Sequence, residues 1–481
     1  MKLALSRKNL WEHSPGWLKG SVGLVLGMVP PEYLLGGRFR RNLRFVEEAQ
    51  WWPAEKSRAY QLEQLQRIFM IAGTAPYYRK VFHDAGFDPR GCSLEDMQRL
   101  PTIDRSTIHE HLQEMCTLPP SSPQVDYTST GGTSGMPLHF YIGSGRSAIE
   151  YAYLVSGWGR AGFRLTAERA VFRGRVVPPD RSGLRHDYDP LLRQHSYSNF
   201  HMTQENMRAY LEHVSGLGPC FLHVYPSSIT TLARFVQRSG MTPPGNIRGI
   251  LAESENVYPD QRQLVEDTFG CRYFSSYGHT EKLVAAAECE KSTVYHVWPT
   301  YGYLELLDEA GRPVTTPGGR GEIVGTGFIN SVTPFIRYRT GDYATYVGDK
   351  CKACGREHML ITEIRGHRVQ ESLLASDGTL VSWVALNLHD DTFDKVVQFQ
   401  FRQDSPGTAM LRVVPSAGFG EDDRARIANS LRRKLAGRVD FSVELVESIA
   451  LSKNGKAIYV DQRTPGADQF NPELTPESSQ G

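Results

Sequence analysis

Hydrophobic positions follow two different periods along this chain. Over residues 54–72, apolar side chains recur every three or four positions, which predicts an amphipathic helix. Short apolar runs at 220–225 and 247–251 predict buried strands, and the helical pattern at 229–237 lies between them. Strands and helices continue to alternate in this way. The pattern therefore predicts an α/β protein in which β-sheets are flanked by helices.

The pattern changes near residues 365–368, and the segment after this point has the size of a small separate domain. The elements expected there are strands at 396–401, 410–415 and 441–446 and a helix at 422–436. The tail is rich in Pro, Gln, Ser and Glu, a composition typical of disorder. The expected division is a large N-terminal domain at 1–364 (with an irregular wrap at 1–50), a hinge at 365–368, a small α/β C-terminal domain at 369–463 and a disordered tail at 464–481.

Composition narrows the class of protein. The chain has 481 residues, 40% hydrophobic and 22% charged, with a net charge of +1. Such a balance provides no bulk field for nucleic acid or anionic lipid, so we expect no nucleic-acid partner. The apolar run at 22–30 is too short to span a bilayer, and no clear signal-peptide cleavage pattern comes after it. Seven cysteines are too few and odd in number for a disulfide framework, and we expect a cytoplasmic protein.

A loop rich in glycine and hydroxyl groups lies between two runs with strand character. Its residues are Thr128, Ser129, Thr130, Gly131, Gly132, Thr133, Ser134 and Gly135. Backbone N–H groups in such a loop can close around an anion, and the hydroxyls add further donors. An ordinary hairpin turn is the alternative, but a tight turn needs fewer residues. The loop therefore predicts a phosphate-binding site.

Four further motifs occur in order, each unremarkable by itself. They are Tyr277-Gly278-His279-Thr280-Glu281, Arg339-Thr340-Gly341-Asp342, Gly366-His367-Arg368 and Asn454-Gly455-Lys456. A tyrosine can stack on a base, and carboxylates can bind Mg²⁺ or ribose hydroxyls. Each motif taken alone is more often a turn or an exposed lysine.

Together with the glycine loop, and in this order, the motifs resemble those of the adenylate-forming superfamily of acyl- and aryl-CoA ligases. Two further segments resemble the branch of phenylacetate–CoA ligase and the capsular polysaccharide protein CapK. They are Pro334-Phe335-Ile336-Arg337-Tyr338 and Ala385-Leu386-Asn387-Leu388-His389. The resemblance covers residues 55–463. It implies an adenylate-forming large domain and a mobile C-terminal lid domain.

The resemblance also implies a reaction with two steps. A carboxylic acid first joins the α-phosphate of ATP and releases pyrophosphate, and the acyl group then passes to CoA. The implied roles are phosphate binding by Thr128 through Gly135, adenine stacking by Tyr277 beside Gly278, α-phosphate contact by Thr280, Mg²⁺ binding by Glu281, ribose binding by Asp342 and charge neutralisation by Lys456. Either His367 or Arg368 takes the place of the arginine usual at the family's hinge.

The acyl pocket is expected near the segment that comes after the strand at 220–225. Its predicted lining is His223, Tyr225, Pro226 and Glu253, and the aromatic content suits an aryl or short apolar acid. Tyr225 as an ordinary core residue is an equal alternative.

Cysteine spacing predicts a metal site as well. Cys351 and Cys354 have the spacing of half a zinc knuckle, and Cys289 and His296 flank an expected hairpin. These four would form a closed Cys₃His site for a structural Zn²⁺. Two unrelated turn cysteines and a surface histidine are the alternative.

The resemblance leaves the acyl acceptor open. An enzyme that passes the acyl group from the adenylate to an amine or sugar, without CoA, is one alternative. A catalytically idle nucleotide-binding homologue that acts as a scaffold in a biosynthetic complex is another. The presence of Glu281, Asp342 and Lys456 favours a working ligase.

Overall fold

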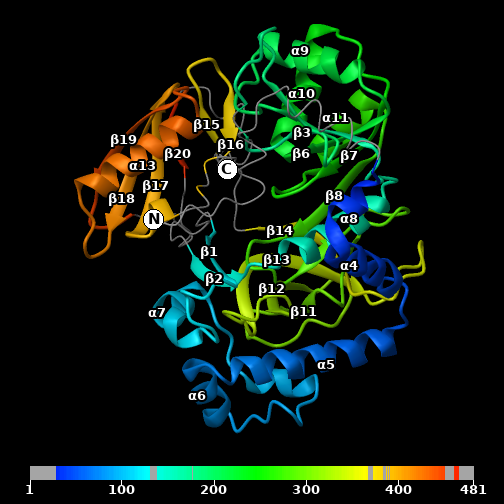
Figure 1. The fold of residues 1–481 in the computed structure, drawn as a ribbon, viewed down its shortest axis with the longest axis vertical. Helices are drawn as coiled ribbons and strands as arrows, with labels where there is room; N and C mark the ends of the chain where they lie inside the picture. The colour runs from blue at the N-terminus through cyan, green and yellow to red at the C-terminus, as the bar shows by residue number, and fades with distance from the viewer. Residues whose placement is uncertain are drawn as a thin grey trace, which may run out of the picture.

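The computed structural model describes residues 29–130, 138–175, 177–366, 372–382, 386, 388, 391–449 and 460–464. The described part begins with a series of helices, two of which, α5 (Ala54–Ala72) and α6 (Pro76–Asp84), lie along the bottom of the view in Figure 1. The others are α3 (Pro31–Leu34), α4 (Gly36–Ala49), the 3₁₀ helix η1 (Glu95–Arg99) and α7 (Arg105–Met115). The helix predicted over 54–72 is therefore confirmed. Asp104 caps α7, because its carboxylate accepts from the Thr107 N–H at 2.9 Å.

The N-terminal region differs from the expected irregular wrap. Residues 36–49 form the helix α4, which buries Phe39, Val46 and Ala49. Phe39 and Val46 pack in two clusters that also contain residues of α8 (Ser147–Gly159). The helix was missed because four arginines and two glycines conceal its apolar stripe, which only the contact with α8 completes.

The largest sheet has twelve strands in the order β11-β12-β13-β14-β10-β9-β8-β7-β6-β3-β5-β4. One half is mainly parallel and is built from β3 (Glu168–Phe172), β4 (His186–Asp189), β5 (Gln194–Tyr197), β6 (Cys220–Val224), β7 (Ile247–Ala252) and β8 (Tyr273–Gly278), with β4 antiparallel at the edge. The helices that connect or flank these strands are α9 (Gln204–Ser215), α10 (Pro226–Ser239) and α11 (Pro259–Phe269).

The other half of this sheet is antiparallel. It consists of β9 (Ala285–Ala287), β10 (Tyr295–Val297), β11 (Gly302–Leu307), β12 (Arg320–Gly327), β13 (Tyr338–Gly348) and β14 (Leu360–Arg365). The two halves meet at β8, which runs parallel to β7 and antiparallel to β9. Ligands of open α/β sheets bind at the carboxyl ends of parallel strands, so this junction is the expected place for a site.

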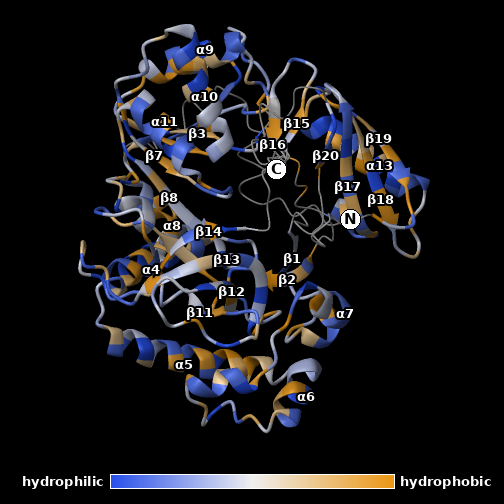
Figure 2. Ribbon diagram, turned by 180° about the vertical axis from the view of Figure 1, so that it is seen from behind, coloured by the Kyte–Doolittle hydropathy of each residue, from blue (hydrophilic) through white to orange (hydrophobic). Residues whose placement is uncertain are grey.

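Alternate residues of the parallel strands face two different hydrophobic clusters. Leu222 and Ile250 pack with α9, α10 and α11 on one face. Phe221 and Leu251 point to the other face, toward α8 and α4. Figure 2 shows hydrophobic and hydrophilic residues alternating along helices such as α5 and α10, as expected for helices that cover a sheet on one side.

The C-terminal part forms a separate hydrophobic core. Its elements are β15 (Ser372–Leu374), β16 (Leu380–Ser382), η2 (Asp391–Phe393), β17 (Val396–Ser405), β18 (Thr408–Pro415), α13 (Glu421–Lys434), β19 (Asp440–Leu445) and β20 (Val460–Gln462). Four of these strands form a sheet in the order β19-β18-β17-β20, beside which α13 lies (Figure 1). The predicted strands and helix of this region are present.

The C-terminal part contacts the large domain at several points. His139 Nδ1 lies 3.2 Å from Asp394 Oδ1, and Ser129 Oγ donates to the Leu388 carbonyl at 3.4 Å. Phe200 of the large domain packs in the C-terminal core, and its carbonyl accepts from Arg438. Among the described residues, no helix is long and apolar enough to cross a membrane.

Candidate active site and metal cluster

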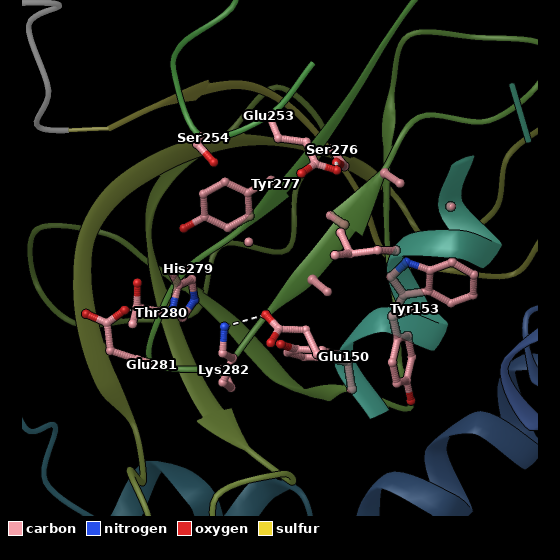
Figure 3. A pocket seen from close by; sticks show the side chains of 18 of the residues that line it. Glu150, Tyr153, Glu253, Ser254, Ser276, Tyr277, His279, Thr280, Glu281 and Lys282 are labelled. Carbon is pink, nitrogen blue, oxygen red and sulfur yellow. Dashed lines mark hydrogen bonds and ion pairs between the residues drawn. The ribbon is translucent and has the colours of Figure 1, made fainter. Parts of the chain in front are cut away.

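A cavity of about 370 Å³ lies where the parallel and antiparallel halves of the sheet meet (Figure 3). Residues from the carboxyl ends of β7 and β8, from α8 and from β9 line it. The predicted site residues that line it are Thr130, Tyr225, Glu253, Tyr277, Gly278, Thr280, Glu281 and Asp342. Five segments that are distant in the sequence thus line one cavity.

Strand β8 places the aromatic ring of the site. Its end pairs with β9, with Tyr277 opposite Ala286 and Gly278 opposite Ala285. The Tyr277 hydroxyl donates to Asp342 Oδ2 at 2.8 Å, which links β8 to β13. One oxygen of the Asp342 carboxylate is held in this way, so the tyrosine and the carboxylate act as one unit.

The loop after β8 is held by a groove of three glycines. Leu283 packs over Gly302, Gly325 and Gly327, which lie on the neighbouring strands β11 and β12. A Cβ at Gly302 would lie 1.9 Å from the Leu283 carbonyl oxygen, and a Cβ at Gly325 would lie 2.8 Å from the Leu283 Cβ. The backbone can approach this closely only because these positions lack side chains. The groove therefore fixes the loop that carries Thr280 and Glu281.

Glu281 is a buried carboxylate on this loop. Its Oε2 lies 3.3 Å from His279 Nδ1. Burial would raise the pKa of Glu281, but His279 and the positive charge of Arg105 outweigh it and lower the pKa to about 2. The other ring nitrogen of His279, Nε2, is buried without a hydrogen-bond partner in the described part of the chain. An ionised carboxylate beside an unsatisfied imidazole nitrogen fits a site for a hard cation and phosphate oxygens.

A second buried carboxylate, Glu253, comes directly after β7. It accepts from Trp158 Nε1 at 2.8 Å, from Arg173 Nη1 at 2.8 Å and from Ser276 Oγ at 2.9 Å. Burial would raise its pKa, but its contacts with His223, Arg173 and Trp158 lower it below the usual range. Glu253 is therefore ionised and orients Arg173, which lines the cavity.

His223 and Pro226 do not line the cavity, in contrast to Tyr225 and Glu253. The His223 ring contacts Arg173 Nη1 and lies 3.2 Å from Glu253. Burial and the charge of Arg173 lower the pKa of His223 to about 3, so the imidazole is neutral. His223 thus supports the site from behind, whereas Pro226 begins α10.

The apolar end of the cavity was not found from the sequence. Tyr153 and Gly157 of α8 line it together with Ala287 of β9, Trp298 and Tyr301. The rings of Tyr153 and Tyr301 meet edge to face, with centroids 4.9 Å apart. These residues look like ordinary core positions in the sequence, and only the fold shows that they face a cavity. Lys282 and Glu150 form an ion pair beside this end (Figure 3).

The Cys₃His site predicted from spacing assembles in the structure. One ligand atom each from Cys289, His296, Cys351 and Cys354 lies within 4.8 Å of all the others. The Val294 carbonyl lies 3.0 Å from His296 Nδ1, and Nε2 lies 3.3 Å from Cys354 Sγ. Burial and the charge of Arg160 lower the pKa of His296 to about 4, which keeps it neutral as a metal ligand must be.

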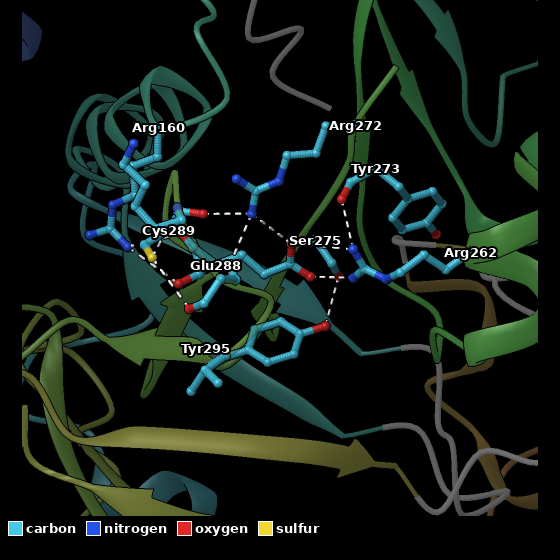
Figure 4. Close-up of polar contacts among 12 residues, drawn as sticks. Arg160, Arg262, Arg272, Tyr273, Ser275, Glu288, Cys289 and Tyr295 are labelled. Carbon is cyan, nitrogen blue, oxygen red and sulfur yellow. Dashed lines mark hydrogen bonds and ion pairs between the residues drawn. The ribbon is translucent and has the colours of Figure 1, made fainter. Parts of the chain in front are cut away.

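Ion pairs fix the backbone that leads into this cluster (Figure 4). Glu288 is fully buried and pairs with Arg262 and Arg272. Arg272 also donates to the Ser292 carbonyl at 3.0 Å, across the turn that contains Cys289. Burial would raise the pKa of the Cys289 thiol, but hydrogen bonds with Ser292 and the Lys291 N–H lower it, which favours the thiolate.

Several predicted site residues lie outside the described part of the chain. They are Gly131, Gly132, Thr133, Ser134, Gly135, His367, Arg368 and Lys456. Thr128 and Ser129, predicted as the first residues of the glycine loop, instead end the strand β1 (Val125–Ser129), because they continue its pairing. This strand pairs with β2 (His139–Gly143), and the Thr130 N–H donates to the Leu138 carbonyl at 2.8 Å.

The fold is that of the adenylate-forming CoA ligases. The structure of 2-hydroxyisobutyryl-CoA ligase in complex with 2-HIB-AMP and CoA in the thioesterification state aligns with a TM-score of 0.54 at 20% identity, over 89% of this chain and 95% of that chain. The open conformation of that ligase, in complex with the same two ligands, aligns with a TM-score of 0.53 at 19% identity, over 85% of this chain and 94% of that chain. The predicted fold class is therefore confirmed.

Sequence comparisons confirm the resemblance to the phenylacetate–CoA ligase and CapK branch. Residues 373–463 match the CapK C-terminal domain. The chain is 25% identical to phenylacetate-coenzyme A ligase of Thermus thermophilus, over 67% of this chain and 73% of the relative. It is 21% identical to protein CapK of Staphylococcus aureus, over 80% of this chain and 84% of the relative.

Proposed function

We propose that this protein adenylates a carboxylic acid with ATP, releases pyrophosphate and passes the acyl group to CoA. The observation that carries the proposal is the single cavity that collects Tyr277, Thr280, Glu281 and Asp342 at the carboxyl ends of the parallel strands. The structural relative with this fold is a CoA ligase in complex with 2-HIB-AMP and CoA.

Tyr277 and Asp342 are proposed to bind the nucleoside. The hydrogen bond between them presets the Asp342 carboxylate, whose second oxygen is available to a ribose hydroxyl. Thr280 is proposed to contact the α-phosphate, with Thr128 through Gly135 around the β- and γ-phosphates. Lys456 would offset the repulsion between the phosphate and the substrate carboxylate.

Glu281 is proposed to bind Mg²⁺, which supplies positive charge against the phosphates. The support is its ionised, buried carboxylate in the cavity wall. Carboxylate oxygens are the ligands that this hard cation prefers. His279 lies at the same wall and offers a ring nitrogen to phosphate oxygens.

The acid is proposed to be aryl or short and apolar. Aromatic rings of Tyr153, Trp298 and Tyr301 and the small side chains of Ala285 and Ala287 line one end of the cavity. Such a surface favours a flat or compact apolar group. Arg173 and the Ser254 hydroxyl, 2.6 Å apart, line the same cavity and can orient a polar substituent.

An acceptor other than CoA is the second candidate. The observation that favours it is the match of residues 373–463 to the CapK C-terminal domain, because the resemblance to the capsular polysaccharide branch leaves a sugar or amine acceptor open. In that case an amine or sugar takes the acyl group directly. The lid movement about residues 365–368 is part of either scheme.

The Cys₃His cluster is proposed to hold a structural Zn²⁺. Four ligands with three thiols leave no open position, which is typical of structural zinc sites. The site closes the turn between β13 and β14 against β10, so its contribution is to stability rather than to the reaction.

The experiment is pyrophosphate release with ATP, Mg²⁺ and a panel of aryl, fatty and amino acids, with and without CoA. An acid that drives release with stoichiometric consumption of CoA supports the proposal. An acid that drives release without any effect of CoA supports the amine or sugar acceptor. Binding of ATP without release across the panel would contradict a ligase and favour the idle homologue.

A matched pair of variants tests the role of Glu281. Glu281→Gln removes one charge from the proposed metal site and is expected to lower the adenylation rate by about 100-fold. Glu309→Gln removes one charge from an exposed turn and is expected to leave the rate unchanged. Equal rates in the two variants would exclude Glu281 from the reaction.

A further inference from the structure

Three histidines converge at the far edge of the large sheet, away from the cavity. His186 begins β4, His195 lies in β5 and His213 lies near the end of α9. One ring nitrogen from each lies within 4.8 Å of the other two. His186 Nε2 and His195 Nδ1 are 2.9 Å apart, and the rings of His186 and His213 have centroids 4.4 Å apart.

Second contacts fix which nitrogens face the centre of this cluster. His195 Nε2 lies 3.2 Å from Glu168 Oε2, and an ionised carboxylate can only accept. The Nε2 atom therefore carries the proton and Nδ1 presents its lone pair toward His186. His213 Nδ1 lies 2.7 Å from the Tyr197 hydroxyl, which leaves Nε2 as the nitrogen that is free for a ligand.

Metal-binding histidines show this arrangement as a rule. Their second ring nitrogen contacts a carboxylate or another oxygen, which sets the tautomer and the ring orientation. Here two of the three histidines have such a partner, Glu168 for one and Tyr197 for the other. Without a metal, His186 Nε2 donates to His195 Nδ1 at 2.9 Å, and a bound ion would take the place of that proton.

We propose that His186, His195 and His213 bind a divalent transition-metal ion, with Zn²⁺ as the probe of choice. Three imidazole nitrogens suit Zn²⁺ and its neighbours in the first transition series. Three protein ligands leave a fourth position for water or an external ligand, which distinguishes this site from the closed Cys₃His cluster. The ion would tie β4 and β5 to α9.

The site is separate from the reaction cavity. Glu168 begins β3, whereas Arg173 lies just past the other end of the same strand and lines the cavity. Binding at the histidines is therefore expected to be independent of ATP. It does not rest on the proposed ligase function.

The test is metal binding to the full-length protein after removal of metal with a chelator. Because the Cys₃His cluster is also proposed to hold zinc, the wild type is expected to bind about two equivalents. His195→Gln is expected to bind about one, and His83→Gln about two, since the His83 side chain is 88% exposed and far from the cluster in sequence. Cys354→Ser is expected to lose the equivalent of zinc at the Cys₃His cluster, which His195→Gln is expected to keep.

Cobalt distinguishes the two sites by their ligands. Co²⁺ in the Cys₃His cluster gives a thiolate-to-cobalt charge-transfer band, which Co²⁺ bound by histidines alone does not give. The His195→Gln variant is expected to keep this band and lose the second equivalent. Loss of both the band and the second equivalent would show that the variant has disturbed the fold. Protection of the wild-type histidines by Zn²⁺ then tests whether the histidine site binds metal.

Protection of the wild type against a histidine reagent needs no variant. Diethyl pyrocarbonate is expected to modify His186 and His213, both partly exposed, more slowly when Zn²⁺ is present, as read by peptide mass spectrometry. The proposal is overturned if His195→Gln binds as much metal as the wild type, or if the two histidines react equally with and without Zn²⁺.

Discussion

Replacement of Glu253 by Gln tests how the wall of the cavity is held together. The change preserves the size of the side chain and removes its charge. The Glu253 side chain is 10% exposed and its partner Arg173 is 21% exposed, so both are largely shielded from water. Trp158 and Ser276 also donate to the carboxylate.

The expected cost results from this burial. Removal of one partner from a buried ion pair costs about 3–5 kcal/mol, because the other charge remains uncompensated. The amide oxygen of Gln can still accept from Trp158 or Ser276, which places the loss at the lower end, at about 3 kcal/mol. Arg173 would also lose its orientation in the cavity.

A neighbouring ion pair provides a matched control. Arg175 donates to Asp187 at 2.7 Å, but the two side chains are 43% and 31% exposed. Asp187→Asn is therefore expected to cost only about 0.5 kcal/mol. Urea unfolding at pH 7, followed by tryptophan fluorescence, measures both variants. Losses of equal size would refute the assignment of Glu253 as a buried, ionised anchor.

Two further predictions concern the glycine groove and the pH dependence of stability. Gly325→Ala places a Cβ against Leu283 and is expected to lower the adenylation rate about 10-fold by displacing Glu281. Gly245→Ala, whose Cβ would meet nothing within 4 Å, should leave the rate unchanged, and equal rates would argue against the groove. Between pH 6.5 and about 3, an unfolded His223 binds a proton and the folded one does not, so acidification lowers the stability of the wild type. His223→Gln removes this contribution, so the urea midpoint of the variant should fall less than that of the wild type between pH 7 and pH 5. If the urea midpoints of the two proteins fall in parallel with pH, His223 is not held neutral.

Local patterns predicted the parts of the site that depend on short spacing. The Cys351 and Cys354 pair needs only one turn, and Cys289 and His296 come together through one hairpin, so spacing was sufficient. The helix over 54–72 was also predicted, because its apolar stripe is complete within its own sequence.

The residues that were missed depend on contacts between distant elements. Arg173 comes after a short strand and resembles any surface arginine until Glu253, 80 positions later, is placed beside it. In the sequence, Tyr153 and Trp298 have the pattern of core residues, because a cavity wall and a core share the same hydrophobic pattern. The histidine cluster combines two strands and a helix, and no spacing in the sequence joins them.

The Cys₃His cluster lies one strand away from the apolar end of the cavity. His296 pairs in register with Ala287, and Ala287 is part of the cavity wall. Oxidation or alkylation of the thiols would therefore disturb the apolar end of the cavity, which is proposed to meet the acid, before it disturbs the end lined by Tyr277 and Asp342. In the proposed reaction, the choice among acids, more than the use of ATP, is the property that would respond to the redox state of the surroundings.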